Sequence, residues 1–177
     1  DERPISAEPV NIHDVIEHVR QIAQSGFARN IEFRQEFDPS LPPGPGMRDL
    51  LIQALLNLVK NASEAISELG DVGGRIVLRT AFRPGVRLTV PGSGSRVTLP
   101  LLIEIQDNGV GIKPDMQKHI FEPFVTVKTS GTGLGLALGA KIISDQGGVI
   151  ECESVPRNTT FRILLPLQRP EARPEDT

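Results

Sequence analysis

Two glycine clusters, the first led by a carboxylate, are the residues of this chain whose types and spacing could do chemistry. The first is Asp107-Asn-Gly-Val-Gly-Ile112 and the second is Gly131-Thr-Gly-Leu-Gly-Leu-Ala137. This arrangement suits a nucleotide whose base is held at one end and whose phosphates are held at the other. Either cluster alone is weak evidence, because glycines also occur in ordinary turns.

The first cluster predicts a site for adenine. Side chains alternate along a strand, so Ile103, Ile105 and Asp107 share one face, with Asp107 at the edge of an apolar layer. A buried carboxylate is costly to desolvate unless a donor meets it. The amino group of adenine is such a donor, whereas guanine would present a carbonyl. Gly109 and Gly111 let the backbone pass close to a flat ring.

The second cluster predicts a phosphate site. Free backbone N–H groups at the start of a helix bind anions, and glycines allow a close approach. Its spacing differs from those of the Walker loop and the dinucleotide fingerprint. The residues expected to line this site are Gly131, Thr132, Gly133, Leu134 and Gly135.

Two side chains near this cluster have alternative roles. Lys128 lies three residues before Gly131, and we predict that it neutralises γ-phosphate charge as a compact cation. The alternative is a solvated loop lysine. The Thr132 hydroxyl is expected to donate to a phosphate or to cap the helix, and these roles are compatible.

A helix expected over residues 47–69 carries a polar stripe beside its buried one. At about 100° per residue, Gln53, Asn57, Asn61 and Glu64 fall near one another. Asparagine is a mediocre helix former, so two of them one turn apart invite a functional explanation. Their amide oxygens suit Mg²⁺, which predicts Asn57 and Asn61 as metal ligands beside the phosphates. The alternative is two surface asparagines without a role.

The composition excludes several classes of function. The 177 residues carry a net charge of −3, which gives no basic field for nucleic acid or anionic lipid. No apolar run approaches the length of a membrane span. The single cysteine, Cys152, cannot form an internal disulfide and fits a reducing compartment. We therefore expect a cytoplasmic chain, or the cytoplasmic piece of a larger protein.

Periodicity along the chain predicts an α+β fold. Helices are expected over residues 10–25, 47–69 and 132–146, and strands over residues 31–37, 75–81, 101–107, 149–155 and 160–167. Leu69 and Leu138 are expected on the buried sides of their helices. Two short runs flanking residues 91–95 predict an exposed β-hairpin insertion. The result is a two-layer α/β sandwich whose mixed, mostly antiparallel sheet is covered on one face by three helices.

The same reading divides the chain into three parts. Residues 1–9 are expected to form a linker or entering segment, and residues 10–167 one domain, for which the resemblance described next implies a catalytic ATP-binding role. Residues 168–177, rich in proline and charge, are expected to be a disordered tail.

Four motifs, in order and spacing, resemble the N, G1, F and G2 boxes of histidine protein kinase ATP-binding domains. They are Asn57-Leu-Val-Lys-Asn-Ala-Ser-Glu-Ala65, Asp107-Asn-Gly-Val-Gly-Ile112, Phe121-Glu-Pro-Phe124 and Gly131-Thr-Gly-Leu-Gly-Leu-Ala137. Those domains share the Bergerat ATP-binding fold with gyrase and Hsp90. Details of these motifs, with the hairpin, look most like the nitrogen-regulation sensor kinases.

The resemblance implies a set of roles and partners. ATP would lie under a mobile lid over residues 108–132, with Asp107 reading adenine, and with Asn57 and Asn61 near Mg²⁺. The γ-phosphoryl group would pass to a histidine on a dimerisation domain of the same protein. A response regulator would follow, and the nitrogen-regulation type adds a PII-type signalling protein as a possible partner.

No histidine of this chain matches the acceptor pattern of the family. His13, His18 and His119 are the histidines present, and none begins a His-Glu-x-x-x-Pro sequence. We therefore expect the acceptor to lie outside this chain, and the isolated domain to be monomeric.

The absence of a water-activating base is a further expectation. In hydrolytic relatives a glutamate one turn before the metal asparagine activates water, and Asn57 occupies that place here. An amide has no useful basicity, so ATP would be kept for a histidine, whose neutral imidazole needs little base help. Glu64 is the alternative base. Thr160 is expected to reach adenine through water.

Two other functions remain open at this stage. One is a stand-alone serine kinase of the anti-sigma-factor type, which shares the fold. The other is a regulatory module that binds nucleotide without transferring phosphate. The phenylalanine box and the long second glycine cluster favour the histidine kinase.

Overall fold

The computed structural model describes residues 8–70, 73–85, 87–89, 96–122 and 135–167. Its elements in chain order are α1 (Ile12–Ser25), β1 (Glu32–Glu36), α2 (Arg48–Ser67), β2 (Arg75–Phe82), β3 (Arg87–Thr89), β4 (Arg96–Thr98), β5 (Leu101–Asp107), α3 (Pro114–Gln117), α4 (Gly135–Asp145), β6 (Val149–Val155) and β7 (Asn158–Leu165). No helix in the described ranges is both long enough and apolar enough to cross a membrane.

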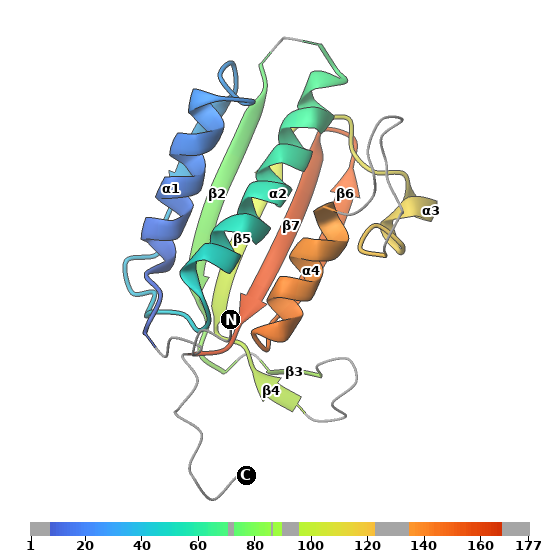
Figure 1. Cartoon of the computed structure of the whole chain (residues 1–177). Coiled ribbons are helices and arrows are strands. Elements are labelled where there is room, and N and C mark those ends of the chain that lie inside the picture. Colours follow the sequence, from blue (N-terminus) through green and yellow to red (C-terminus); the bar gives the residue numbers. More distant parts are fainter. Residues whose placement is uncertain (1–7, 71–72, 86, 90–95, 123–134, 168–177) are drawn as a thin grey trace, which may run out of the picture.

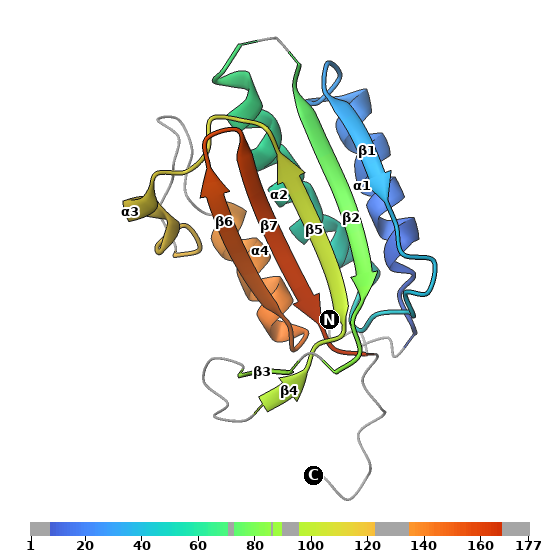
Figure 2. The same ribbon diagram turned by 180° about the vertical axis from the view of Figure 1, so that it is seen from behind.

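One sheet organises these elements. Its strand order is β1-β2-β5-β7-β6; β1 pairs with β2 in parallel, and the other neighbours pair antiparallel. Helices α1, α2 and α4 cover one face (Figure 1), and the other face is open over most of its length (Figure 2). The expected α+β sandwich with a mixed, mostly antiparallel sheet is confirmed.

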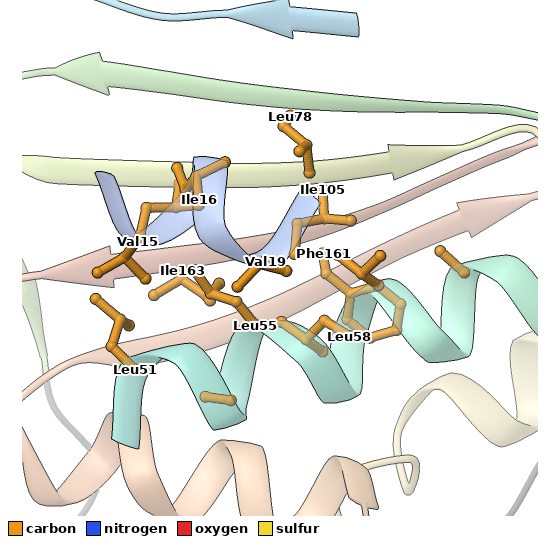
Figure 3. Packing of buried hydrophobic residues seen from close by; sticks show 14 of the residues in the cluster. Val15, Ile16, Val19, Leu51, Leu55, Leu58, Leu78, Ile105, Phe161 and Ile163 are labelled. Carbon is orange, nitrogen blue, oxygen red and sulfur yellow. The ribbon is translucent and has the colours of Figure 1, made fainter. Parts of the chain in front are cut away.

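The main core lies between the helices and the covered face of the sheet. Alternation along the strands and helical periodicity point apolar side chains into this layer from both sides. Figure 3 shows them meeting, and they are Val15, Ile16 and Val19 of α1, Leu51, Leu55 and Leu58 of α2, and Leu78, Ile105, Phe161 and Ile163 of the strands.

The hairpin β3–β4 closes one end of the open face. Leu99, Leu102 and Leu164 form a second buried cluster, and Val97 of β4 packs against it. The hairpin therefore attaches through apolar contacts at the start of β5. The segment between its two strands, including residues 91–95, lies outside the described residues.

Local signals explain most of the element boundaries. Asn11 caps α1, because its Oδ1 accepts the N–H of Asp14 at 3.1 Å, and Gly26 is the C-cap residue. Strand β7 begins at Asn158, two residues earlier than the sequence predicts. The short helix α3 is not predicted at all. The expected linker residues 1–7 and tail residues 168–177 lie outside the described part of the chain.

Two predicted core positions are wrong. Leu69 is 45% exposed, since it follows the last residue of α2. Leu138 is 41% exposed, because α4 turns Gly139 toward α2, where a Cβ would lie 3.7 Å from the Ala54 carbonyl oxygen. Because Gly139 is small, α4 packs closely on α2, and the neighbouring Leu138 is left exposed to solvent.

Candidate nucleotide-binding site

Asp107 ends strand β5 at the floor of a small cavity. Its side chain is only 2% exposed, and its Oδ1 accepts the Gly109 N–H at 2.9 Å. Its Oδ2 is buried and has no hydrogen-bond partner in the part of the chain that the structure describes. Burial raises the pKa of Asp107 to about 6, opposed by the Gly109 hydrogen bond. The fold thus presents a buried acceptor that lacks a donor.

The cavity around this oxygen joins three parts of the fold. It encloses about 30 Å³ and is lined by Asn61, Ala65, Glu68, Asp107, Val110, Gly111, Ile112 and Thr159. A second cavity of about 590 Å³ shares its residues Glu68, Val110, Gly111 and Ile112. The loop after β5 therefore forms a wall common to a narrow inner space and a wider outer one.

The first glycine cluster packs directly on helix α2. A Cβ on Gly109 would lie 2.6 Å from the backbone carbon of Ala65, so only glycine fits without a shift. The next residue, Val110, donates its N–H to the Ala65 carbonyl at 3.0 Å. Gly111 adopts a φ of 85° beside the β6–β7 turn, where a Cβ would lie 3.1 Å from the Val155 carbonyl oxygen.

A polar network ties this loop to the β6–β7 hairpin. Ser154 Oγ accepts the Ile112 N–H at 2.8 Å and lies 2.6 Å from Thr159 Oγ1. The Gln117 side-chain amide of α3 donates to the carbonyls of Ile112 and Ser154, at 2.9 and 2.8 Å. Arg157 donates its N–H to the Gly109 carbonyl at 3.0 Å. Each edge of the cavity is therefore fixed by a hydrogen bond.

Thr159, and not Thr160, is the threonine at the cavity. Asp107 is registered directly opposite Thr159, whereas Thr160 is opposite Gln106 and Glu153 and points to the open face. Sequence reasoning missed Thr159 because it started the last strand too late. Alternation from the buried Phe161 is the signal that could have found it.

The polar stripe of α2 reaches two places. Asn61 is 7% exposed and lines the cavity of Asp107. Asn57 is half-buried, and its Nδ2 donates to the Gly135 carbonyl at 3.2 Å. This hydrogen bond connects α2 to the start of α4. Glu64 is also half-buried, whereas Gln53 is exposed. The structure therefore brings Asn61 and Asp107 together at the cavity, whereas Asn57 bonds to Gly135.

Cys152 lies on the same face of β6 as Ser154 and is half-buried. Burial raises the pKa of its thiol to about 12, and the nearby charges of Asp107 and Glu153 add to this. Such a thiol is protonated at neutral pH and is therefore a poor nucleophile.

Part of the predicted phosphate site lies outside the described residues. This applies to Lys128, Gly131, Thr132, Gly133 and Leu134, and Phe124 of the phenylalanine box also lies outside them. Gly135, the last glycine of the second cluster, begins α4 as described. Its position beside Asn57 brings the two ends of the predicted site within one surface.

The chain matches a known family and several known proteins. Residues 46–169 match the model of the histidine kinase-, DNA gyrase B- and HSP90-like ATPases. The chain is 56% identical over 94% of its length to the sensory histidine kinase/phosphatase NtrB of Azospirillum brasilense, and covers 41% of that protein. It is 51% identical over 100% of its length to NtrB of Rhizobium meliloti strain 1021, and covers 46% of it.

Solved structures agree with these matches. The mycobacterial sensor histidine kinase MprB superposes with a TM-score of 0.71 at 25% identity, over 90% of this chain and 97% of that one. A nucleotide-free catalytic domain of the histidine kinase ThkA superposes with a TM-score of 0.69 at 27% identity, over 92% of this chain and 98% of that one. The chain thus spans less than half of its NtrB relatives but nearly all of these catalytic domains.

The match over residues 46–169 includes the Asp107 cavity, the asparagines of α2 and the described part of α4, and the fold agrees with the solved domains. The resemblance read from the four sequence motifs is thereby confirmed. The chain belongs to the family of histidine kinase-, DNA gyrase B- and HSP90-like ATPases.

Proposed function

We propose that this chain is the catalytic ATP-binding domain of a nitrogen-regulation sensor histidine kinase. It binds Mg·ATP and transfers the γ-phosphoryl group to a histidine on a dimerisation domain outside this chain. The observation that carries the proposal is the buried Oδ2 of Asp107, which has no hydrogen-bond partner among the described residues. The amino group of adenine is the donor that fits it.

The residues around this oxygen fit a purine. Asp107 would accept the amino hydrogen, while the close packing of Gly109 on α2 and of Gly111 on the β6–β7 turn holds in place the loop that forms one wall of the cavity. Ala65 and Ile112 supply apolar contacts on two sides. Adenine burial there removes the unmet acceptor at the floor of the site.

The phosphates would extend from this cavity toward the start of α4. Asn57 and Asn61 would hold Mg²⁺ through their amide oxygens, since magnesium prefers hard oxygen ligands and takes the rest from water and phosphate. The backbone of Gly131 to Gly135, the Thr132 hydroxyl and Lys128 would hold the phosphate oxygens. When bound, Mg²⁺ supplies charge neutralisation. Asn57 also withholds a base from water, because an amide does not accept a proton at neutral pH.

We propose three partners, which the resemblance to nitrogen-regulation sensor kinases implies. They are the histidine-bearing dimerisation domain, a cognate response regulator and a PII-type signalling protein. The proposed location is the cytoplasm, and the isolated domain is proposed to be monomeric. Residues 10–167 form the domain, with a linker at residues 1–9 and a tail at residues 168–177.

The test has two steps. First, Mg·ATP at 100 times its Kd should stabilise the 177-residue chain by about 2.7 kcal/mol, seen as a rise in melting temperature. Second, mixing the chain with the dimerisation domain of its parent protein and labelled ATP should place acid-labile, base-stable phosphate on that domain. Acid-stable phosphate would instead identify a serine kinase, and ATP binding without transfer would identify a regulatory module.

Asn61→Asp tests the metal assignment. A carboxylate beside Asp107 and the phosphates adds repulsion, so the affinity for Mg·ATP should fall at least tenfold, a change of about 1.4 kcal/mol. Calorimetric titration measures it. Asn30→Asp, on an exposed loop residue, is the control with the same change of charge. Equal affinities for the two variants would remove Asn61 from the site.

A further inference from the structure

A row of side chains crosses the covered face of the sheet at the cavity. Ser154 of β6 is registered opposite Thr159 of β7, and Thr159 opposite Asp107 of β5. Side chains directly opposite each other on antiparallel strands are close neighbours. Asp107 and Thr159 line the inner cavity, while Ser154 lines the wider outer one and contacts Thr159 through a 2.6 Å hydrogen bond.

The hydrogen bonds of this row can be counted. A hydroxyl has one proton and two lone pairs. Ser154 Oγ already accepts the Ile112 N–H, and the Ser154 carbonyl is held by Gln117. If Ser154 donates to Thr159, the proton of Thr159 is left to point into the cavity. If Thr159 donates instead, its proton is used and the cavity meets only its lone pairs.

The two arrangements of the hydroxyl protons differ in which purine base they can bind. When the adenine amino group donates to Asp107, the ring nitrogen beside it is an acceptor and needs a donor. Guanine carries a carbonyl and an N–H in the same two places. A Thr159 hydroxyl that is free to turn could serve either base. A hydroxyl that Ser154 fixes as a donor serves adenine alone.

We propose that Ser154 is a positioning residue, which orients the Thr159 hydroxyl as a donor toward the ring nitrogen of adenine and so contributes to the choice of ATP over GTP. This role rests on the proposed function. In this proposal Ser154, on the wall of the outer cavity, acts on the base through its hydrogen bond to Thr159. Its fixed position between Ile112 and Thr159 is what allows it to set the direction of the bond.

The test compares the ratio of GTP to ATP dissociation constants among variants of the 177-residue chain. Ser154→Ala should lower this ratio about fivefold, the effect of one hydrogen bond, and Ser154→Thr should restore it. Thr159→Val should lower it by a similar factor. In the double variant, Ser154→Ala should cause no further fall, because its effect passes through Thr159. Glu153→Ala, on the opposite face of β6, is the control and should leave the ratio unchanged.

The outcomes separate the two proposals. If the unchanged chain does not bind ATP, the proposed function fails and this inference fails with it. If the chain prefers ATP, but Ser154→Ala keeps the full ratio or its effect adds to that of Thr159→Val, the role of Ser154 is wrong and the proposed function stands. If Ser154→Ala does not fold, the variants Thr159→Val and Thr159→Ser provide the test. An unchanged ratio of GTP to ATP dissociation constants in Thr159→Val would overturn the proposal.

Discussion

The Asp107 carboxyl carries a free-energy cost in the folded chain. Its Oδ2 is buried without a partner, and burial raises its pKa to about 6. The folded state therefore binds a proton more tightly at this group than the unfolded state does. The resulting destabilisation is absent below the unfolded pKa of about 3.9 and complete above the folded one.

Asp107→Asn should separate stability from binding. Without the buried charge, the free energy of unfolding should rise by about 1–2 kcal/mol at pH 8 and change little below pH 4. ATP affinity should be lost, because the acceptor no longer carries charge and its amide presents hydrogens to the amino group. Urea unfolding at both pH values and calorimetry measure the two effects. Unchanged ATP affinity would contradict the role of Asp107.

The contribution of His13 to stability depends on pH in the opposite direction to that of Asp107. It stacks on Phe37 with ring centroids 4.5 Å apart, and its Nε2 lies 2.8 Å from Thr80 Oγ1. Burial lowers its pKa from 6.5, an effect that the negative charge of Asp38 partly offsets. Neutral His13 therefore contributes stability above pH 6.5 that is lost as the pH falls through that value toward the folded pKa.

His13→Gln should remove this acid-side loss. Glutamine keeps a polar group near Thr80 but does not titrate, so its free energy of unfolding should fall less than that of the unchanged chain between pH 7.5 and 5.5. Urea unfolding at the two pH values is the measurement. His18→Gln, at an exposed residue of the same helix, is the control. Parallel pH curves for all three proteins would show that His13 is not responsible.

For individual residues, the sequence predicted the chemical role of a side chain better than its position in the fold. Asp107 was identified because a carboxylate ending an apolar strand requires a donor. Thr159 was missed because the last strand was predicted to begin at Thr160, so the alternation from Phe161 was not followed back to position 159. The role of Ser154 depends on a 2.6 Å contact across the β6–β7 hairpin, which no spacing in the sequence reveals.

Among the elements, the loop after β5 depends on close packing against helix α2. It contacts the last turns of α2 through Ala65 and the β6–β7 turn through Arg157. Because Gly109 has no side chain, its backbone fits closely against helix α2. The loop can therefore form one wall of the cavity. The sequence predicted a close approach at this glycine, but toward a nucleotide, whereas the structure shows the approach to be to helix α2.

Gly109→Ala should therefore destabilise the fold as well as the site. Its Cβ would meet the Ala65 backbone at 2.6 Å, which forces the loop outward at a cost of about 1–3 kcal/mol and displaces the wall of the cavity. Urea unfolding and ATP titration measure both losses. Gly26→Ala, whose Cβ would meet only Ile22 carbonyl oxygen at 3.4 Å, is the matched control. A loss no greater than that of the control would refute this packing argument.

Most of the helices and strands could be predicted from the sequence, whereas the residues at which they begin and end could not. Strong periodicity identified α1, α2 and strand β5, since hydrophobic patterns of this length have few alternatives. Helix α3 has only four residues, too few for a period to show. The exposure of Leu138 depends on how α4 packs on α2 at Gly139, which is a property of two helices together.

The open face of the whole molecule carries a row of alternating charges. It runs from Glu36 of β1 through Arg79 and Glu104 to Arg162 of β7 and Glu151 of β6. These residues are registered opposite one another across the sheet. Glu104, at the centre, is 8% exposed and bonds both arginines. Opposite charges on neighbouring strands favour this register over a shifted one.

Glu104→Gln should weaken the fold without affecting the site. Two arginines would lose their shared partner, so the free energy of unfolding should fall by about 1–2 kcal/mol, while the Kd for Mg·ATP should stay within twofold. Glu153→Gln, whose side chain is 76% exposed, should cost less than about 0.5 kcal/mol. Thermal unfolding and calorimetry test both variants. A change in ATP affinity for Glu104→Gln would show that the two faces are coupled.

Strand β5 begins at the hairpin and ends at Asp107, so about 20 Å of extended chain lie between them. This distance makes the domain convenient for optical work. A Thr98→Cys variant would offer a fluorescent dye one exposed thiol at the hairpin, while Cys152, with its pKa of about 12, would react slowly. Such a label could follow docking of partner proteins in solution while leaving the nucleotide untouched.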